Sequence, residues 1–160
     1  MESMMKGRKS DNRTLEYDDR AMRLGVELYR QNEILMELLY HLMKTQRLHS
    51  FSAILVYSQA EGFGAFLRKH KRRTDLLYEL EGCDGVYALF CQETQVDGGY
   101  YFIRRLMELM DPKSVEELRV GIVGVESTRY PLKDLIFIVL DTFIRAESPE
   151  GEKIVFRTVK

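Results

Sequence analysis

Two nearly continuous apolar segments constrain the fold of this chain more than any other feature. They cover Phe51–Tyr57 and residues 117–125. A strand with one solvated face alternates apolar and polar residues, whereas an unbroken apolar run is typical of a strand buried on both faces of a sheet. We therefore expect a sheet whose central strands are covered by helices.

The other segments supply these helices and the remaining strands. Apolar residues at three- and four-residue steps predict helices over residues 15–47, 65–71, 100–110 and 132–146. Two short apolar runs, Leu76–Leu80 and Val86–Phe90, flank a glycine-containing turn and predict a hairpin. With a last strand over Ile154–Phe156, the order α–β–α–β–β–α–β–α–β predicts the α+β class, a mixed sheet with helices packed on it.

Glycine, proline and polar residues set the expected boundaries. Residues 1–14 are mostly polar and are predicted to form a disordered tail. Gly25 favours a break between a leading helix over residues 15–28 and a domain over residues 29–160. The apolar face of the leading helix needs a partner, and we expect a second copy of the chain to supply it in a homodimer. Residues 97–99 predict a turn, and Pro112 predicts the end of the helix before it.

Length and composition indicate one globular domain. The chain has 160 residues, of which 45% are apolar and 31% charged, an ordinary balance for a soluble protein. A formal net charge of −1 argues against binding nucleic acid or membranes through the overall field. No apolar run approaches the roughly 18 residues that span a bilayer, and the N-terminus lacks the apolar centre of a secretory signal. We expect a cytoplasmic protein without a membrane span.

The two cysteines, Cys83 and Cys91, lie eight residues apart without a CxxC pattern. Their spacing predicts positions on opposite strands of the hairpin, where a disulfide is conceivable. A reducing cytoplasm with two free thiols is the favoured reading. Neither a triad-like partner for Cys83 nor a metal-ligand spacing of the three histidines is evident in the sequence.

A basic segment precedes the hairpin. Residues 68–73 are all Arg, Lys or His, and the segment ends in the charged turn Arg72-Arg73-Thr74-Asp75. No aromatic residue interleaves the segment as a stacking platform, so a solvated helix face is a simpler reading than nucleic-acid binding. Five residues separate this turn from the hairpin turn Glu81-Gly82-Cys83-Asp84-Gly85.

The order of these blocks resembles the GGDEF domain, a ferredoxin-like palm related to nucleotide cyclases. The resemblance covers residues 30–156. Arg72–Phe90 resembles the RxxD motif, strand, GGDEF hairpin and second strand of the family without a gap. Phe51–Tyr57 stands where the first core strand lies, Gly121–Val125 resembles a later core strand, and Leu132–Ala146 resembles the closing helix.

The chain departs from the family where a working cyclase binds metal and substrate. The resemblance implies an aspartate at the end of the first strand and an acid in the hairpin, which together hold two Mg²⁺ ions. Here the first strand ends in Tyr57-Ser58-Gln59, and Cys83 occupies the hairpin position unless the register shifts by one residue to Asp84. The guanine-reading segment survives only as Glu61-Gly62-Phe63. We therefore predict no cyclase activity, no metal site and no cofactor.

The RxxD turn is the nucleotide-handling element that remains. In the family, the matching arginine and aspartate contact guanine and phosphate of cyclic di-GMP, a dianion with two guanine bases. A second arginine comes from the helix after the hairpin, where Arg104 lies nearer the expected position than Arg105. Two further arginines of the basic segment would add positive potential. The predicted ligand-binding residues are Arg68, Arg72, Arg73, Asp75, Arg104 and Arg105.

Three functions follow as hypotheses. The favoured one is a non-catalytic receptor that binds cyclic di-GMP at Arg72 and Asp75 and relays the binding to a partner protein. The alternative is a ligand-free scaffold for dimerisation or protein interaction, in which the Arg72–Asp75 pair is a surface salt bridge that caps a turn. Residual cyclase activity, or another reaction of GTP, is the weakest of the three.

Overall fold

The computed structural model describes the backbone of residues 2–160 and the side chains of residues 19–160. The prediction of a disordered tail over residues 1–14 lies outside the fully described residues. The helices are α1 (Glu2–Lys44), α2 (Phe63–His70), α3 (Val96–Leu109), α4 (Pro112–Glu117) and α5 (Leu132–Glu147). The strands are β1 (Phe51–Tyr57), β2 (Leu76–Glu79), β3 (Val86–Gln92), β4 (Arg119–Val125) and β5 (Ile154–Val159).

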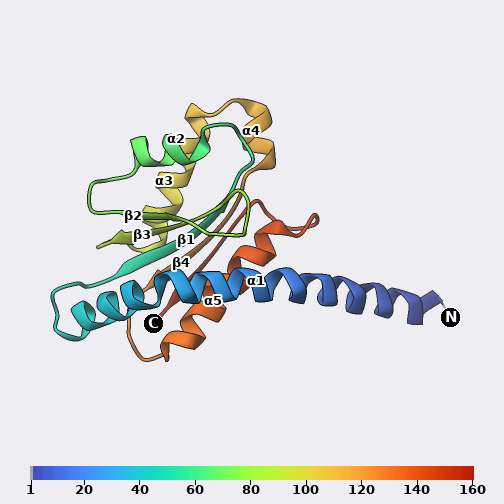
Figure 1. The fold of residues 1–160 in the computed structure, drawn as a ribbon, viewed down its shortest axis with the longest axis horizontal. Helices are drawn as coiled ribbons and strands as arrows, with labels where there is room; N and C mark the ends of the chain where they lie inside the picture. Colours follow the sequence, from blue (N-terminus) through green and yellow to red (C-terminus); the bar gives the residue numbers. More distant parts are fainter. Residues whose placement is uncertain (1) are drawn as a thin grey trace.

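The strands form one mixed sheet in the order β2-β3-β1-β4-β5. All neighbours run antiparallel except β4 and β5, which are parallel. In the centre of the sheet, Ile54 of β1 lies opposite Leu89 of β3 and Ile122 of β4. Helices α1 and α5 cover one face, and α2 and α3 cover the other (Figure 1). The predicted α+β class and the buried central strands are confirmed.

Glycines in β4 let the covering helices approach the sheet closely. A Cβ atom on Gly121 would lie 2.6 Å from the backbone of Phe143 in α5. Because this distance is well inside van der Waals contact, α5 can pack at its observed depth only against a residue without a side chain. Gly121, which appears in the sequence as part of an apolar strand, therefore also determines how closely α5 packs on β4.

The first helix does not break at Gly25. Helix α1 continues through this residue, where a Cβ atom would lie 3.2 Å from Cδ2 of Leu140 in α5. Ala21, Leu24 and Leu28 are buried in the core that α1 shares with α5. The glycine thus serves close packing rather than a break, and α5 of the same chain covers this part of the apolar face.

The predicted turn at residues 97–99 is wrong, whereas the predicted end of the helix before Pro112 is confirmed. Residues 97–99 instead lie in the first turn of α3. Gly99 is buried there, and a Cβ atom on it would lie 3.0 Å from Cγ2 of Ile122, so this glycine allows close packing of α3 on the sheet. Pro112 follows the end of α3 but also begins α4, whose first turn is capped by Asp111, since its carboxylate accepts a hydrogen bond from the backbone N–H of Ser114. Cys83 lies in the hairpin turn rather than on a strand, and both cysteines are free thiols.

Of the helices in the described part of the chain, none combines the length and apolarity that crossing a membrane requires.

Candidate functional site

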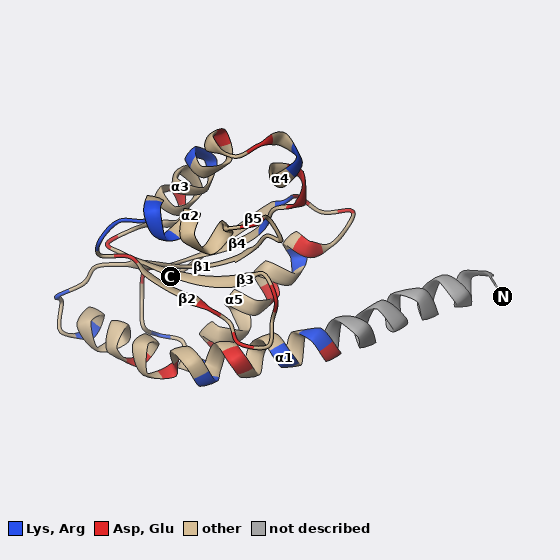
Figure 2. Ribbon diagram, turned by 45° about the horizontal axis from the view of Figure 1, so that its top comes forward, with Lys and Arg blue, Asp and Glu red and all other residues tan. Residues whose placement is uncertain are grey.

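The Arg72–Asp75 turn connects α2 to the edge strand β2. Lys and Arg gather at the end of α2 and in the turn that follows (Figure 2). The backbone N–H of Asp75 donates to the carbonyl of Arg72 at 3.1 Å and closes the turn. The ammonium of Lys71 donates to the carbonyl of Asp75 at 2.9 Å. The sequence Arg-x-x-Asp therefore forms a tight turn with its own backbone bonds.

The carboxylate of Asp75 is held by its own arginine. Asp75 is 2% exposed, and its Oδ2 accepts from the backbone N–H of Arg72 at 2.8 Å. Its Oδ1 accepts from Nε and Nη2 of the Arg72 guanidinium at 3.1 Å and 2.9 Å. Asp75 therefore fixes the direction of Arg72 instead of presenting a carboxylate to solvent.

The guanidinium of Arg72 also reaches across the end of β3. Its Nη2 donates to the carbonyl of Gln92 at 2.9 Å and to Oγ1 of Thr94 at 2.6 Å. The hydrogen bonds to Asp75 raise the pKa of Arg72 above its ordinary value, so the group stays charged. The side chain remains 51% exposed. Arg72 is thus an oriented cation with one side open to solvent.

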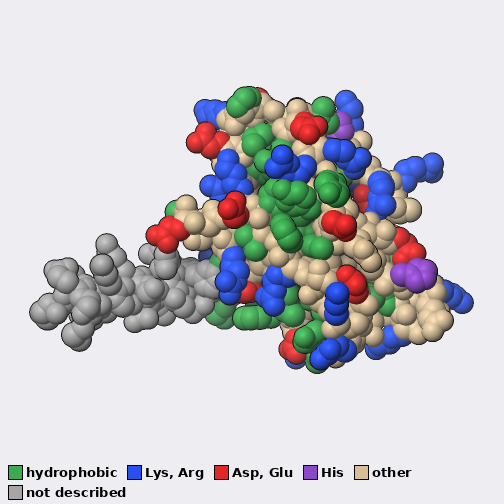
Figure 3. All heavy atoms as spheres, turned by 180° about the vertical axis from the view of Figure 1, so that it is seen from behind, with side chains coloured by type: hydrophobic (Ala, Val, Ile, Leu, Met, Phe, Trp, Pro, Cys, Tyr) green, Lys and Arg blue, Asp and Glu red, His purple; other side chains and the backbone are tan. Residues whose placement is uncertain are grey.

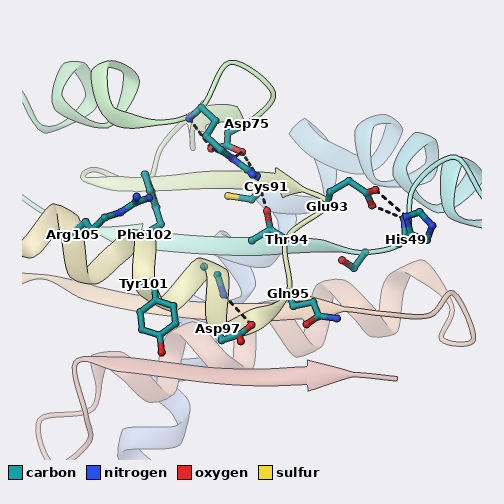
Figure 4. A pocket seen from close by; sticks show the side chains of 14 residues that line it. His49, Asp75, Cys91, Glu93, Thr94, Gln95, Asp97, Tyr101, Phe102 and Arg105 are labelled. Atoms are coloured by element: carbon teal, nitrogen blue, oxygen red, sulfur yellow. Dashed lines mark hydrogen bonds and ion pairs between the residues drawn. The ribbon is translucent and has the colours of Figure 1, made fainter.

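A pocket of about 540 Å³ opens beside this arginine (Figure 4). Arg72 and Asp75 line one side, and the first three turns of α3 contribute Gly98, Tyr101 and Arg105. Among the described residues, no carboxylate forms an ion pair with Arg105. The pocket therefore combines two guanidinium groups from separate elements of the fold.

The structure separates the six predicted site residues. Arg72, Asp75 and Arg105 line the pocket together. Arg104 does not line it, because its guanidinium lies over the ring of Tyr100 at 6.0 Å from the centroid. Arg68 and Arg73 also lie outside the lining. Of the two neighbouring arginines on α3, the one that faces the pocket is Arg105, one residue beyond the expected position.

Sequence reasoning missed the rim of the pocket. His49 precedes β1 and Glu93 follows β3. The pairing of Phe51 with Gln92 places the start of β1 beside the end of β3 and so brings His49 and Glu93 together. The backbone N–H of His49 donates to Oε1 of Glu93 at 2.7 Å, and the Nδ1 atom lies 2.9 Å from Oε2. These bonds hold the pKa of Glu93 below its ordinary value. The antiparallel register was the signal that could have found this pair.

The floor of the pocket contains a buried thiol. Cys91 is 3% exposed and lies next to the Arg72–Asp75 turn. Burial, followed by the negative charge of Asp75, raises the pKa of this thiol far above its ordinary value. Because a thiolate is the reactive form, burial and the raised pKa both disfavour a nucleophilic role for Cys91.

The hairpin turn on the other end of β2 is tied to α1. The backbone N–H of Glu81 donates to Oε1 of Gln31 at 3.0 Å, and Nε2 of Gln31 donates to the carbonyl of Glu79 at 3.3 Å. Arg30 forms an ion pair with Glu81 at 2.8 Å. Asp84, the acid that a register shift would place at the metal position, lines a hollow with Arg20 and Arg23 of α1.

The end of β1 offers a hydroxyl where the resemblance implies a carboxylate. Ser58 is buried, its backbone N–H donates to the carbonyl of Gly85 at 2.9 Å, and its Oγ accepts from the N–H of Ala60 at 3.1 Å. Within the described residues, no group of three or more His, Cys, Asp or Glu side chains gathers as a metal site.

No family model matches this chain, and no curated protein matches it. Solved structures do. The GGDEF domain of FimX from Pseudomonas aeruginosa has a TM-score of 0.60 at 10% identity, over 80% of this chain and 92% of that one. The diguanylate cyclase SiaD from Pseudomonas aeruginosa, solved with its activator SiaC, gives 0.53 at 12% identity, over 97% and 76%.

A third similar structure contains a nucleotide. The GGDEF domain of DgcB from Caulobacter crescentus, solved in complex with cyclic di-GMP, has a TM-score of 0.52 at 5% identity, over 78% of this chain and 89% of that one. At such identities the likeness concerns the arrangement of helices and strands. This chain therefore has a GGDEF-like fold.

Proposed function

We propose that this chain is a non-catalytic receptor that binds cyclic di-GMP in the pocket between Arg72 and Arg105. The observation that carries the proposal is the convergence of these two guanidinium groups, from the turn before β2 and from α3, on one pocket of about 540 Å³. Binding sites for ligands of this size usually have volumes of about 300–1,000 Å³. The DgcB domain, which has a similar fold, was solved with this ligand.

The charges of the pocket suit a dianion. Guanidinium groups recognise phosphate and the acceptor edge of guanine through paired N–H donors. Three acidic side chains also line the pocket, and each is engaged within the protein: Asp75 with Arg72, Glu93 with His49, and Asp97 with the backbone N–H of Gly98 at 3.1 Å. The first turn of α3 adds the positive end of a helix dipole. In this proposal Asp75 is a positioning residue for Arg72.

The pocket lies near the start of β1 and the end of β3. The residues near the opposite ends of these two strands support a non-catalytic role. Ser58 follows β1 where a metal-binding aspartate is implied, and the hairpin position is Cys83, which is 8% exposed. A hydroxyl and a buried thiol with a pKa raised by burial are poor ligands for Mg²⁺, which prefers carboxylate oxygens. The proposal therefore assigns binding without synthesis, and a relay to a partner protein.

The experiment is titration calorimetry with cyclic di-GMP on four proteins. The unaltered chain is expected to bind in the micromolar range, about −8 kcal/mol. Arg72→Ala and Arg105→Ala should each lose on the order of 2–5 kcal/mol. Arg73→Ala removes the same charge from a neighbouring position outside the pocket and should bind almost normally. Circular dichroism of each variant checks folding, and absence of heat for the unaltered chain at high micromolar ligand would refute the proposal.

One observation favours the second candidate, a homodimeric scaffold. An apolar groove of about 860 Å³ runs between α1 and α5, where Met22, Val26 and Phe137 are 69%, 57% and 66% exposed. Glu33 and Lys133 also line it, so side chains of both charge signs stand at its edge. Light scattering of Phe137→Ser against the unaltered chain tests this candidate. A monomer in both cases, at high micromolar protein, would dismiss it.

A further inference from the structure

Tyr101 presents its ring to solvent from the second turn of α3. Its exposed fraction is 65%, which is high for an aromatic side chain. The ring is nevertheless supported. It packs edge-on against Tyr100, with centroids 6.0 Å apart and planes at 72°, and Tyr100 packs in the same way against Phe156 of β5 at 5.5 Å. A chain of aromatic contacts thus anchors an exposed ring to the sheet.

The ring belongs to the same pocket as the two arginines. Tyr101 and Arg105 stand four residues apart on α3, so they are neighbours on one helix face, with Cβ atoms about 5–6 Å apart. Figure 4 shows Tyr101 across the pocket from Asp75, with its ring directed toward β5, while Arg105 extends from α3 on the side of Asp75. The face seen in Figure 3 gathers hydrophobic side chains near its middle, with Lys and Arg around them. The lining of the pocket thus includes the ring of Tyr101 and the guanidinium groups of Arg72 and Arg105.

This combination is informative about the ligand. A small anion such as phosphate or pyrophosphate needs only the guanidinium groups. A ligand that carries an anionic group and a flat base uses the arginines and the ring together, because base–aromatic stacking contributes about 1–3 kcal/mol per base. An exposed ring held in a fixed orientation also loses little conformational freedom on binding.

We infer that Tyr101 is the base-stacking residue of the pocket and that it makes the site selective for nucleotides over simple phosphates. The inference rests on the proposed function, because it concerns the same pocket. It adds a residue outside the RxxD turn, and it assigns the two tasks separately: Arg72 and Arg105 hold the charge, and Tyr101 holds a guanine ring.

The composition of the chain supplies a direct reporter. The sequence contains no tryptophan, so Tyr101→Trp introduces a single indole at the proposed contact. Phe137→Trp is the matched control, because Phe137 is similarly exposed, 66%, and lines the groove between α1 and α5 rather than this pocket. Cyclic di-GMP should quench the fluorescence of Tyr101→Trp with a midpoint equal to its own calorimetric Kd. It should leave Phe137→Trp unchanged at the same concentrations, and pyrophosphate should quench neither.

Affinity provides the second readout. Tyr101→Ala should weaken cyclic di-GMP binding by about 5- to 150-fold, whereas Tyr101→Phe, which keeps a ring, should stay within about threefold of the unaltered chain. If the unaltered chain binds, but Tyr101→Ala binds equally well and Tyr101→Trp shows no quenching, the assignment of Tyr101 is wrong while the proposed function stands. If the unaltered chain does not bind at all, both are overturned.

Discussion

The turn formed by Arg72 and Asp75 makes a quantitative prediction about stability. Asp75→Ala removes the acceptor of three hydrogen bonds, from the backbone N–H, Nε and Nη2 of Arg72. A hydrogen bond to a charged group contributes about 1.5–3 kcal/mol. The guanidinium is 51% exposed, so water replaces much of what its two bonds contribute, which leaves at most about 1 kcal/mol for them. We expect Asp75→Ala to lower the free energy of unfolding by about 2–4 kcal/mol.

Removal of the arginine should lower the free energy of unfolding more than removal of the aspartate. Arg72→Ala leaves the carboxylate of Asp75, 2% exposed, without its charge partner, which costs about 3–5 kcal/mol. Removing Asp75 as well eliminates that buried charge. The double variant Arg72→Ala/Asp75→Ala should therefore be more stable than Arg72→Ala alone, although it lacks one more native side chain.

Urea denaturation of the three variants measures both effects. Asp84→Ala serves as the control, because it removes an exposed carboxylate from the hairpin turn and should change stability by less than about 0.5 kcal/mol. A loss below about 1 kcal/mol for Asp75→Ala, or a double variant less stable than Arg72→Ala, would show that the turn does not hold Asp75 as described.

Three further outcomes are expected. Gly121→Ala should lower the free energy of unfolding by about 1–3 kcal/mol in urea denaturation, because its Cβ atom would meet the backbone of Phe143; unchanged stability would contradict that close approach. The buried thiols of Cys83 and Cys91, whose pKa values are raised by burial, should resist iodoacetamide near neutral pH in the native chain and react in urea, as mass spectrometry would show; rapid native labelling speaks against their burial. Incubation with GTP and Mg²⁺ should give no cyclic di-GMP by nucleotide chromatography, and any product would reverse the reading of Ser58 and Cys83.

Most of the fold was readable from the apolar pattern. The unbroken run Phe51–Tyr57 predicted the central strand, and the hairpin appeared at its expected place. The errors came from glycines, because sequence alone does not tell a turn from a close contact. Gly25 and Gly99 lie inside helices, where they admit Leu140 and Ile122 of neighbouring elements.

The pocket was less predictable than the fold. The motif identified Arg72, but the rotation of α3 decides whether Arg104 or Arg105 enters, and the helix begins four residues earlier than its apolar pattern predicted. Tyr101 carries no sequence signal of its own, since an exposed tyrosine looks like any surface residue. The RxxD pattern likewise does not reveal that its aspartate is buried by its own arginine.

Strand β2 is only four residues long, Leu76–Glu79, and both of its ends are fastened. Asp75 precedes it in the pocket, and Gln31 of α1 donates to the carbonyl of Glu79, its last residue. About 13 Å of extended backbone thus separates the pocket from the longest helix. Among the described strands, the ladder hydrogen bonds of β2 run to β3 alone, so β2 is an edge strand of the sheet. Whatever occupies the pocket therefore lies one short strand away from the hairpin turn that Gln31 and Arg30 tie to α1.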